Sequence, residues 1–475
     1  MNSTMSANAN SACSGPHARR GFMQIGLTGF ASLGLPALMN LRAAAPAIKK
    51  SNTAVILVWL RGGCSHLDTY DPKPDAEREY RSPFKTISTN VPGTQLTELL
   101  PLQAKIADKF NLLRGMAQTG PGHPAGSLQM LSGDPDSKDK RFPKYPDWMT
   151  VANYLRSQNS EKRALPNYIG VNPITRYDSF TIAGPTYLGP GYAPFGVTGD
   201  PSQPEFAVPN VGLDESKVGR LSDRVALRQN LDQLERSVDL AGGMGALDEF
   251  EQQAMSLLTN PEARNAFDLS KEDKRTRERY GMHRWGQQLL MARRLVESGV
   301  EIITSVLDGP QCGRVNNWDD HAVNQHVFDA LKFRAHDFDQ AVSALIEDVY
   351  ARGLNKRVLV VVSGEFGRTP KISHVASSGG GQASGPAGTV QPGRDHWPRA
   401  FTNLWAGGGF DTGGVIGASD RRGEDAAERI CGPGDFLATI YHHLGIDASK
   451  IMLKDHTGRP IPILADGKPV PELTA

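Results

Sequence analysis

Cysteine and unbalanced charge are both scarce in this chain of 475 residues. The four cysteines are too few and too irregularly spaced for a disulfide scaffold or a Cys-rich zinc site, although one bridge among the last three stays open. They are Cys13, Cys64, Cys312 and Cys431. Lys and Arg number 52 against 51 Asp and Glu, with no basic stripe interleaved with aromatics, so we expect no nucleic-acid partner. With 39% hydrophobic residues, the chain can bury one large core or two smaller ones.

Long apolar runs are also missing, and the apolar stretch Ile25–Met39 falls short of the roughly 20 residues that a membrane-spanning helix needs. This stretch follows the pair Arg19 and Arg20 and precedes the small-residue run Ala43–Ala47. Such an order is similar to a twin-arginine export signal, which we assign to residues 1–47, with a membrane anchor or an ordinary core helix as the alternative. We expect a periplasmic or extracellular protein that meets the membrane only through the export machinery.

Two uninterrupted apolar runs end abruptly in glycine and charge. The first, Ala54–Leu60, leads into a segment that contains His66 and Asp68, and the second, Val358–Val362, leads into S-G-E-F-G-R-T-P. β-Branched runs of this kind predict strands buried in a parallel sheet. Ligands bind at the carboxyl ends of such strands in open α/β sheets, so the charged residues there are candidates for a site.

Helices and strands alternate through the second half of the chain. Helical periodicity over Gly281–Ser298 is followed by a buried strand within Gly299–Gly309, and the long helix Val327–Arg352 leads into Val358–Val362. This alternation predicts an α/β fold, a three-layer α/β/α sandwich with a mostly parallel central sheet. The other expected elements are a helix at Leu221–Leu240, a helix that begins near His123, a strand at Phe401–Ala406 and a last helix at Gly434–Leu444, where His442 and His443 should lie at the surface.

One domain accounts for residues 53–473. Its segment 163–210 is rich in Pro, Gly and aromatics with little periodicity, which is typical of a long ordered loop or a cap over a site. Segment 374–391 is rich in Gly and Ser and is expected to be a mobile loop.

Imidazoles and carboxylates gather where the expected strands end, and mixed N/O ligands favour zinc, manganese or iron, whereas an all-oxygen cage favours calcium or magnesium. The candidates are His66, Asp68, His123, Asp319, Asp320, His321, Glu365, Asp395 and His396. They could hold one or two divalent ions. The alternatives are that single histidines only form hydrogen bonds, and that Asp320 and Asp395 cap helices or pair with Arg368 and Arg394.

Three further residues have open roles. Arg368 could clamp a phosphate or sulfate group, or could form a structural salt bridge. Trp397, like Trp318, could stack on substrate or simply pack. Cys64 is expected to pack or to form half of a disulfide.

Several ordered motifs resemble an uncharacterised exported bacterial family, the domain-of-unknown-function family 1501. These motifs are V-W-L-R-G-G-C-S-H-L-D-T-Y-D at Val58–Asp71, L-S-G at Leu131–Gly133, W-D-D-H at Trp318–His321, S-G-E-F-G-R-T-P at Ser363–Pro370, G-R-D-H-W-P at Gly393–Pro398 and A-G-G-G-F at Ala406–Phe410. The resemblance covers roughly Thr53 to Leu473 and implies an alkaline-phosphatase-like fold, shared with sulfatases and phosphodiesterases. The family's own activity is not established.

The resemblance also implies residue roles, with two departures. Asp68, Asp319, His321, Glu365 and His396 take positions of metal ligands, and His66 could ligate or orient. Phe366 replaces the His that usually follows the acidic ligand. His123 takes the place where sulfatases have a Cys or Ser nucleophile, so it is a proton donor, a metal ligand or a phospho-imidazole nucleophile, with Ser127 as a second choice.

The expected function is an exported, metal-dependent hydrolase of a phosphate or sulfate ester, either a small molecule or a polysaccharide. His123 and Arg368 would be catalytic, with Arg368 and Trp397 on the substrate. A catalytically degenerate member that acts as a secreted binding or assembly protein is the alternative, which Phe366 and His123 favour. A redox protein lacks support, because no Cys cluster, haem motif or dinucleotide-binding glycine pattern is present. The composition of the chain does not indicate an oligomeric state.

Overall fold

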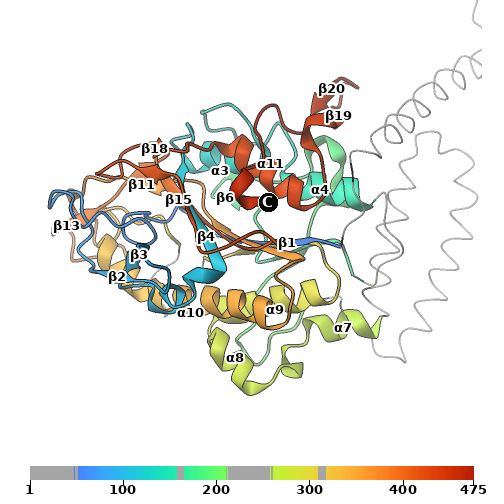
Figure 1. Cartoon of the computed structure of the whole chain (residues 1–475), viewed down its shortest axis with the longest axis horizontal. Coiled ribbons are helices and arrows are strands. Elements are labelled where there is room, and N and C mark those ends of the chain that lie inside the picture. Colours follow the sequence, from blue (N-terminus) through green and yellow to red (C-terminus); the bar gives the residue numbers. More distant parts are fainter. Residues whose placement is uncertain are drawn as a thin grey trace, which may run out of the picture.

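An eight-stranded sheet crosses the molecule, with helices above and below it (Figure 1). The structure is a computed structural model that describes residues 52–157, 165–209, 260–308 and 317–474, with the single residues 48, 211 and 257. The expected export signal at 1–47 and the expected helix at Leu221–Leu240 lie outside the described residues.

The strand order of the central sheet follows the predicted parallel architecture. In order across the sheet, the strands are β16 (Val415–Ile416), β4 (Phe110–Met116), β15 (Phe401–Gly407), β10 (Val358–Ser363), β1 (Ala54–Trp59), β9 (Ile302–Val306), β5 (Tyr168–Val171) and β8 (Phe195–Val197). Only β15 runs against its neighbours β10 and β4. The other pairs are parallel. The prediction of a mostly parallel sheet in an α/β fold is confirmed.

Both faces of the sheet are covered by helices, and the side chains of β1 alternate between the two buried clusters that result. Ile56 and Val58 belong to one cluster, and Leu57 and Trp59 belong to the other. The first face lies against α7 (Pro261–Phe267), α8 (Lys274–Tyr280), α9 (Arg284–Glu297) and α10 (Val327–Ala351), and the second lies against α3 (His123–Ser132), α4 (Trp148–Ser157) and α11 (Pro433–His443) (Figure 1). The three-layer sandwich is therefore as predicted.

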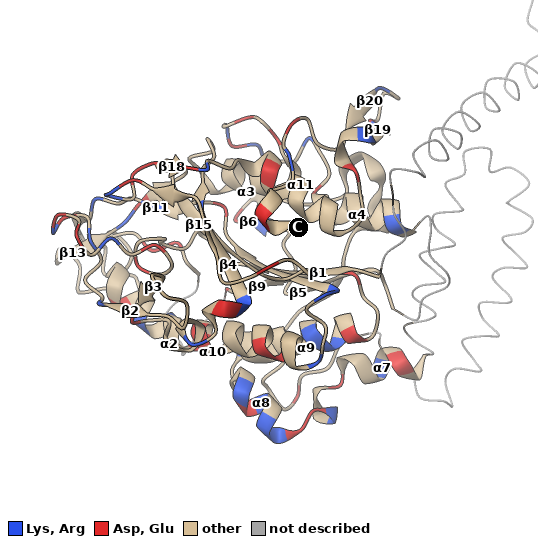
Figure 2. Ribbon diagram, in the orientation of Figure 1, with Lys and Arg blue, Asp and Glu red and all other residues tan. Residues whose placement is uncertain are grey.

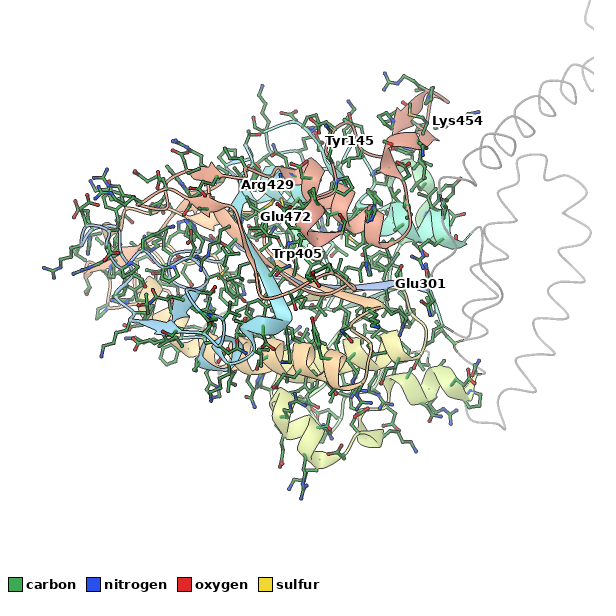
Figure 3. All side chains as sticks on the ribbon, viewed as in Figure 1. Tyr145, Glu301, Trp405, Arg429, Lys454 and Glu472 are labelled. Carbon is green, nitrogen blue, oxygen red and sulfur yellow. The ribbon has the colours of Figure 1, made fainter. Side chains whose placement is uncertain are left out.

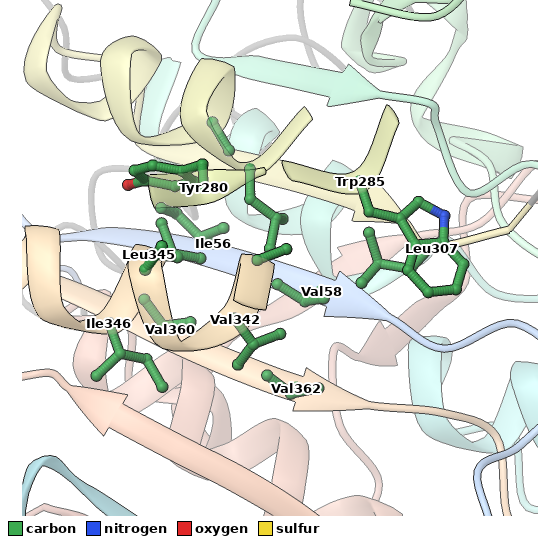
Figure 4. Packing of buried hydrophobic residues seen from close by; sticks show 14 of the residues in the cluster. Ile56, Val58, Tyr280, Trp285, Leu307, Val342, Leu345, Ile346, Val360 and Val362 are labelled. Carbon is green, nitrogen blue, oxygen red and sulfur yellow. The ribbon is translucent and has the colours of Figure 1, made fainter. Parts of the chain in front are cut away.

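Close packing on the α10 side is visible around the middle strands. Val360 and Val362 of β10 face Val342, Leu345 and Ile346 of α10 (Figure 4). On the opposite face, Trp405 of β15, which is labelled in Figure 3, packs edge to face against Phe436 of α11, with ring centroids 5.3 Å apart. These contacts make the sheet a rigid base for the loops at its carboxyl edge.

Two segments expected to be loops contain strands. Residues 165–209 hold the sheet strands β5 and β8, the pair β6 (Arg176–Tyr177) and β7 (Phe180–Thr181), and the turns η3 (Thr186–Leu188) and η4 (Pro190–Tyr192). Segment 374–391 lies largely within the hairpin of β12 (Ser373–Ala376) and β13 (Val390–Gly393). Each strand has four residues or fewer, too short for a periodic pattern to stand out among Pro and Gly.

The remaining elements are short and connect the layers. They are β2 (Thr86–Ser88), β3 (Gln95–Thr97), α2 (Pro101–Ala104), η2 (Ala107–Lys109), η5 (Leu269–Lys271), β11 (Gly367–Arg368), β14 (His396–Trp397), β17 (Ala418–Ser419), β18 (Ala426–Glu428), η6 (Ala448–Lys450), β19 (Met452–Lys454), β20 (Pro460–Pro462) and η7 (Pro471–Leu473). Within the described ranges, no helix has the length and apolar character needed to cross a bilayer.

Candidate metal centre

Four side chains with metal-ligand chemistry meet at the carboxyl edge of the sheet. His123 opens α3 after β4, Asp319 and His321 follow β9 along the chain, and His396 lies in β14. One ligand atom from each of these four lies within 4.8 Å of the other three. It is the one group of this kind in the described part of the chain. The predicted ligands Asp319, His321 and His396 therefore converge, and His123 lies with them as a fourth candidate ligand.

The three imidazoles present the same nitrogen to Asp319. Nε2 of His123 lies 3.0 Å from Asp319 Oδ2, and Nε2 of His321 and of His396 lie 2.7 and 3.1 Å from Oδ1. The last two nitrogens are only 3.1 Å apart. Several electron pairs therefore point toward one small volume.

An oxygen acceptor holds the other nitrogen of each imidazole. Nδ1 of His123 lies 2.7 Å from Glu365 Oε1, and Nδ1 of His321 lies 2.7 Å from Asp395 Oδ1. His396 Nδ1 lies 3.1 Å from the carbonyl oxygen of Pro121. Acceptors at Nδ1 favour a proton there and leave the Nε2 lone pair toward the centre, which is the arrangement that orients metal-ligating histidines.

The centre therefore passes a simple test of fit for a divalent cation. An ionised carboxylate accepts but does not donate, and three Nε2 lone pairs facing it repel one another unless each takes a proton or all share a cation. Three imidazoles and a carboxylate suit a borderline ion such as zinc, manganese or iron. His123, Asp319, His321 and His396 are the residues that would hold it.

The pKa shifts follow from this crowding. Burial opposes ionisation of Asp319, but the three histidines and Arg368 hold its pKa far below the usual range. Burial disfavours the charged form of His123 and His321, yet their carboxylate partners raise the pKa of both. Burial prevails at His396 and lowers its pKa, which favours the neutral imidazole. The site thus combines one firm anion with three imidazoles of unequal basicity.

Glu365 supports His123 and is not among the four converging residues. Its Oε1 accepts from the Gly62 backbone N–H at 2.9 Å as well as from His123. The side chain is fully buried, and Oε2 has no hydrogen-bond partner. A buried carboxylate oxygen without a donor is costly, so Glu365 holds the ring at some expense in stability.

Arg368 is enclosed by backbone. Its Nε donates to Gly63 O at 3.0 Å, and its Nη2 donates to Trp318 O at 3.0 Å and to Gly62 O. The same Nη2 lies 2.8 Å from Asp319 Oδ1. With only 2% of the residue exposed, the guanidinium ties the β1 loop to Asp319. This geometry matches the structural salt bridge that the sequence left open, and an anion clamp stays a prediction.

Two glycines after β1 let the backbone approach the centre. Gly62 and Gly63 have φ angles of 108° and 81°, which side chains of other residues rarely adopt. A Cβ atom at Gly62 would overlap the backbone nitrogen of Asp319, and one at Gly63 would lie 2.7 Å from Phe366 O. The R-G-G part of the first motif therefore serves close packing around Asp319.

Two aromatic rings lie against the histidines of the candidate metal centre. Phe366 lies with its ring centroid 5.1 Å from that of His123 and 4.7 Å from that of His396, so the departure noted in the sequence places an apolar ring here. Tyr177 stacks on His123 at 3.9 Å, and its hydroxyl donates to Asp319 Oδ2 at 2.9 Å. No sequence motif marks Tyr177, which lies in β6 within the segment that the sequence predicts to be a loop.

His66 and Asp68 have other partners. Asp68 Oδ2 pairs with Arg394 Nε at 2.8 Å and accepts from Ser65 Oγ at 2.5 Å, with both charged side chains fully buried. Nε2 of His66 lies 2.9 Å from the Gly423 carbonyl oxygen. Neither residue joins the four-residue group, because Asp68 is paired with Arg394 and His66 lies against Gly423.

The remaining candidates pack. Trp397 donates from Nε1 to Glu424 O at 2.6 Å and carries Arg399 over its ring, and Trp318 stacks on Trp285 with ring centroids 6.0 Å apart. Asp320 forms a buried pair with Arg334 at 2.5 Å. Cys64 is free, and burial raises its pKa to about 12. Cys431 is also free, so no disulfide joins these two.

The model of one protein family, described as "Protein of unknown function (DUF1501)", matches residues 52–474. The chain belongs to this family. The resemblance inferred from the motifs is thereby confirmed, and the match includes each of the four candidate metal ligands described above. Among curated proteins, none matches the chain.

Solved structures of ester hydrolases are similar to this DUF1501 chain at low identity. Phosphonate monoester hydrolase of Agrobacterium radiobacter is 10% identical with a TM-score of 0.37, and covers 89% of this chain and 77% of its own. A sulfatase from Pseudoalteromonas sp. is 12% identical with a TM-score of 0.34, and the match covers 89% of this chain and 72% of the sulfatase. Alkaline phosphatase from the Antarctic bacterium TAB5 is 11% identical with a TM-score of 0.34, and the match covers 84% of this chain and 98% of the phosphatase.

Proposed function

We propose that this protein is a metal-dependent hydrolase of a phosphate or sulfate ester, exported through the twin-arginine route. One observation carries the proposal: three Nε2 atoms and a carboxylate converge at the carboxyl edge of the sheet, with each Nδ1 held by an oxygen. A site oriented in this way is expensive to build, because Glu365 is buried with one oxygen unpaired. Such expense is typical of functional sites.

The donor set supports one ion rather than two. His123, Asp319, His321 and His396 would hold it, while Glu365 and Asp395 orient two of the rings. A divalent ion in such a site supplies Lewis acidity, which makes water a better nucleophile and offsets the negative charge that develops on an ester.

The chain's own groups favour attack by water over attack by a side chain. Ser127 lies fully buried one helical turn after His123, and its Oγ has no hydrogen-bond partner. Burial raises the pKa of the Cys64 thiol to about 12, so a thiolate is scarce at neutral pH. By contrast, the imidazole of His321 contacts Asp395, whose side chain is 56% exposed. This pair can take a proton from the centre and pass it to solvent.

Metal content and turnover of the purified full chain test the proposal together. We expect about one zinc, manganese or iron ion per chain by elemental analysis after dialysis, and turnover of phosphate or sulfate monoesters. Asp319→Asn removes the central anion and should abolish both metal retention and turnover. His442→Ala, on the exposed side of α11, is the matched control and should leave both unchanged.

A folded wild-type protein that holds no divalent ion and turns over none of these esters would end the proposal. Retention of full activity by Asp319→Asn would show that the reaction occurs elsewhere in the molecule.

A secreted binding protein is the second candidate, favoured by the enclosure of Arg368. A guanidinium that donates to three carbonyl groups has few donors left for a substrate anion. Metal retention without turnover of any phosphate or sulfate ester, monoester or diester, is the result expected of this candidate.

A further inference from the structure

A cavity of about 950 Å³ lies apart from the candidate metal centre. Its walls come from the loop before β2, from β2 itself, from the start of α10 and from the β12–β13 hairpin. The lining includes the cations Arg78, Arg81 and Lys85, the aromatic residues Phe84 and Phe328, and Pro392. No residue of this wall is one of the four candidate ligands.

Three lining cations are exposed and have no ion-pair partner among the described residues. They are Arg78, Arg81 and Lys85. The neighbouring Arg421 and Arg422 differ, since both are paired with Glu77 at 2.9 Å. Glu79 is the one acidic residue in the lining, so positive charge prevails in this cavity although the whole chain is almost neutral. Unpaired cations around a concave surface favour anionic ligands.

The cavity floor is apolar. Phe84 and Phe328 meet edge to face with ring centroids 5.9 Å apart, and Ile372 lies beside them. Phe84 and Phe328 are only 8% and 7% exposed. Their faces are therefore not available as the open stacking platforms that bind nucleic-acid bases. A ligand with an apolar ring edge and anionic substituents suits this surface.

A short stretch of chain joins the cavity to the metal centre. Pro392 lines the cavity, and His396 follows four residues later, a span of at most about 14 Å along the backbone. Arg394 lies between them and fixes the relation, because its Nη2 donates to Tyr80 O at 2.9 Å, in the loop that carries the cations. The distance between the two places is therefore short enough for one extended ligand to span.

We propose that this cavity is a second subsite for anions. It binds a phosphate or sulfate group of a polysaccharide while another ester group of the same polysaccharide molecule lies at the metal centre. The inference rests on the proposed hydrolase function and assigns it a substrate class, a glycan with several charged esters. Charge complementarity argues for such an occupant: the cavity has three cations without an ion-pair partner among the described residues, Arg368 has few free donors, and the apolar floor suits the edge of a sugar ring.

Binding of a model polyanion by the full chain tests the subsite. We expect dextran sulfate to bind at low salt and neutral dextran not to bind. The triple variant Arg78→Gln, Arg81→Gln, Lys85→Gln should weaken binding about tenfold, since each exposed ionic contact is individually weak. A control triple removes the same formal charge elsewhere and should change binding less than about twofold. It combines Arg275→Gln, Lys356→Gln and Lys454→Gln; Lys454 lies far from β13 and β2 (Figures 1 and 3).

Turnover of a small aryl monoester separates the two proposals, because such a substrate does not reach the cavity. We expect the cavity triple to turn over the aryl ester at the wild-type rate and the sulfated or phosphorylated glycan more slowly. Dextran polyphosphate compared with dextran sulfate tells which ester is preferred.

Equal binding by the cavity triple and the control triple would overturn the subsite, as would binding of single-stranded DNA more tightly than dextran sulfate. Loss of dextran sulfate binding in the cavity triple, in a protein without any esterase turnover, would instead retain the subsite and reject the hydrolase. Figure 2 shows Lys and Arg at this end of the molecule, near the β13 and β2 labels, together with acidic residues.

Discussion

Single residues determine what the candidate metal centre can do, and Glu365 is the most informative of them. It touches His123 and the Gly62 N–H but none of the other histidines. Glu365→Gln keeps the size and removes the charge that sets the ring orientation. We predict a loss of turnover of about 10–100-fold with about one metal ion per chain retained, measured by steady-state kinetics and elemental analysis of the same sample.

Loss of the ion in Glu365→Gln would contradict this role and would make the glutamate a ligand. Gln118→Glu is not a suitable control, because Gln118 donates to the Glu365 carbonyl. His442→Gln, at the surface, serves that purpose.

Two adjacent histidines on α11 make a matched pair for pH. The sequence suggests that both lie at the surface, which is wrong for His443: it is half-buried, and its Nε2 donates to the Ala54 carbonyl at 3.1 Å. Burial lowers its pKa to about 4, from an ordinary 6.5. The native state then binds fewer protons than the unfolded state between these values, so its contribution to stability is present above pH 6.5 and is lost toward pH 4.

We predict that His443→Gln flattens this dependence. The free energy of unfolding of the wild type should fall by about 1–2 kcal/mol more than that of the variant between pH 7 and pH 5, as measured by urea denaturation. His442→Gln should behave as the wild type does. Parallel curves for all three proteins would show that His443 ionises freely in the folded state.

Residue chemistry was predictable where a motif placed a charged group after a strand. Asp319, His321 and His396 meet as expected, since parallel strands end at one edge of the sheet. Asp68 follows a strand just as directly, yet it pairs with Arg394, 326 positions away. Sequence spacing cannot reveal a competing partner at that distance, and it cannot reveal Tyr177, which reaches Asp319 from a two-residue strand.

At the scale of elements, the turn after β1 determines where Asp319 sits. Gly62→Ala places a Cβ atom against the Asp319 backbone nitrogen, in a backbone conformation with φ of 108°. Strain of about 1–2 kcal/mol and overlap of about 1–3 kcal/mol add together. We predict a loss of about 2–5 kcal/mol in the free energy of unfolding and a loss of metal retention, measured by denaturation and elemental analysis.

Gly93→Ala separates strain from overlap. Gly93 has a φ of 82°, and a Cβ atom there meets nothing within 4 Å. This variant should lose only about 1–2 kcal/mol and keep its metal. Equal effects of the two substitutions would mean that the close approach to Asp319 does not matter.

Elements with strong periodicity were the predictable ones. The strands β1, β10 and β15 and the helices α9, α10 and α11 all lie where the apolar pattern places them. β5 and β8 did not stand out, because β5 has four residues and β8 three, among prolines and glycines. Their place in the sheet comes from pairing with β9 and with each other, which no local pattern encodes.

At the scale of the whole molecule, one strand stabilises two cores. Ile56 and Leu57 are both fully buried, on opposite faces of β1. We predict that Ile56→Ala and Leu57→Ala each lower the free energy of unfolding by about 2–5 kcal/mol, as measured by chemical denaturation. Val415→Ala, on the edge strand β16 with 38% of the residue exposed, should cost less than about 1 kcal/mol. A small effect at either β1 position would show that its layer packs loosely.

The strand order has a consequence for synthesis of the chain. β4 ends at Met116, but its neighbours in the sheet are β15 and β16, which begin at Phe401 and Val415. While a ribosome is still making the first four hundred residues, both edges of β4 lack a partner strand, and His396 has not yet left the ribosome. The nascent chain therefore cannot complete this sheet until residues 401–416 have been made, and until then β4 exposes unpaired backbone N–H and C=O groups on which other chains can aggregate.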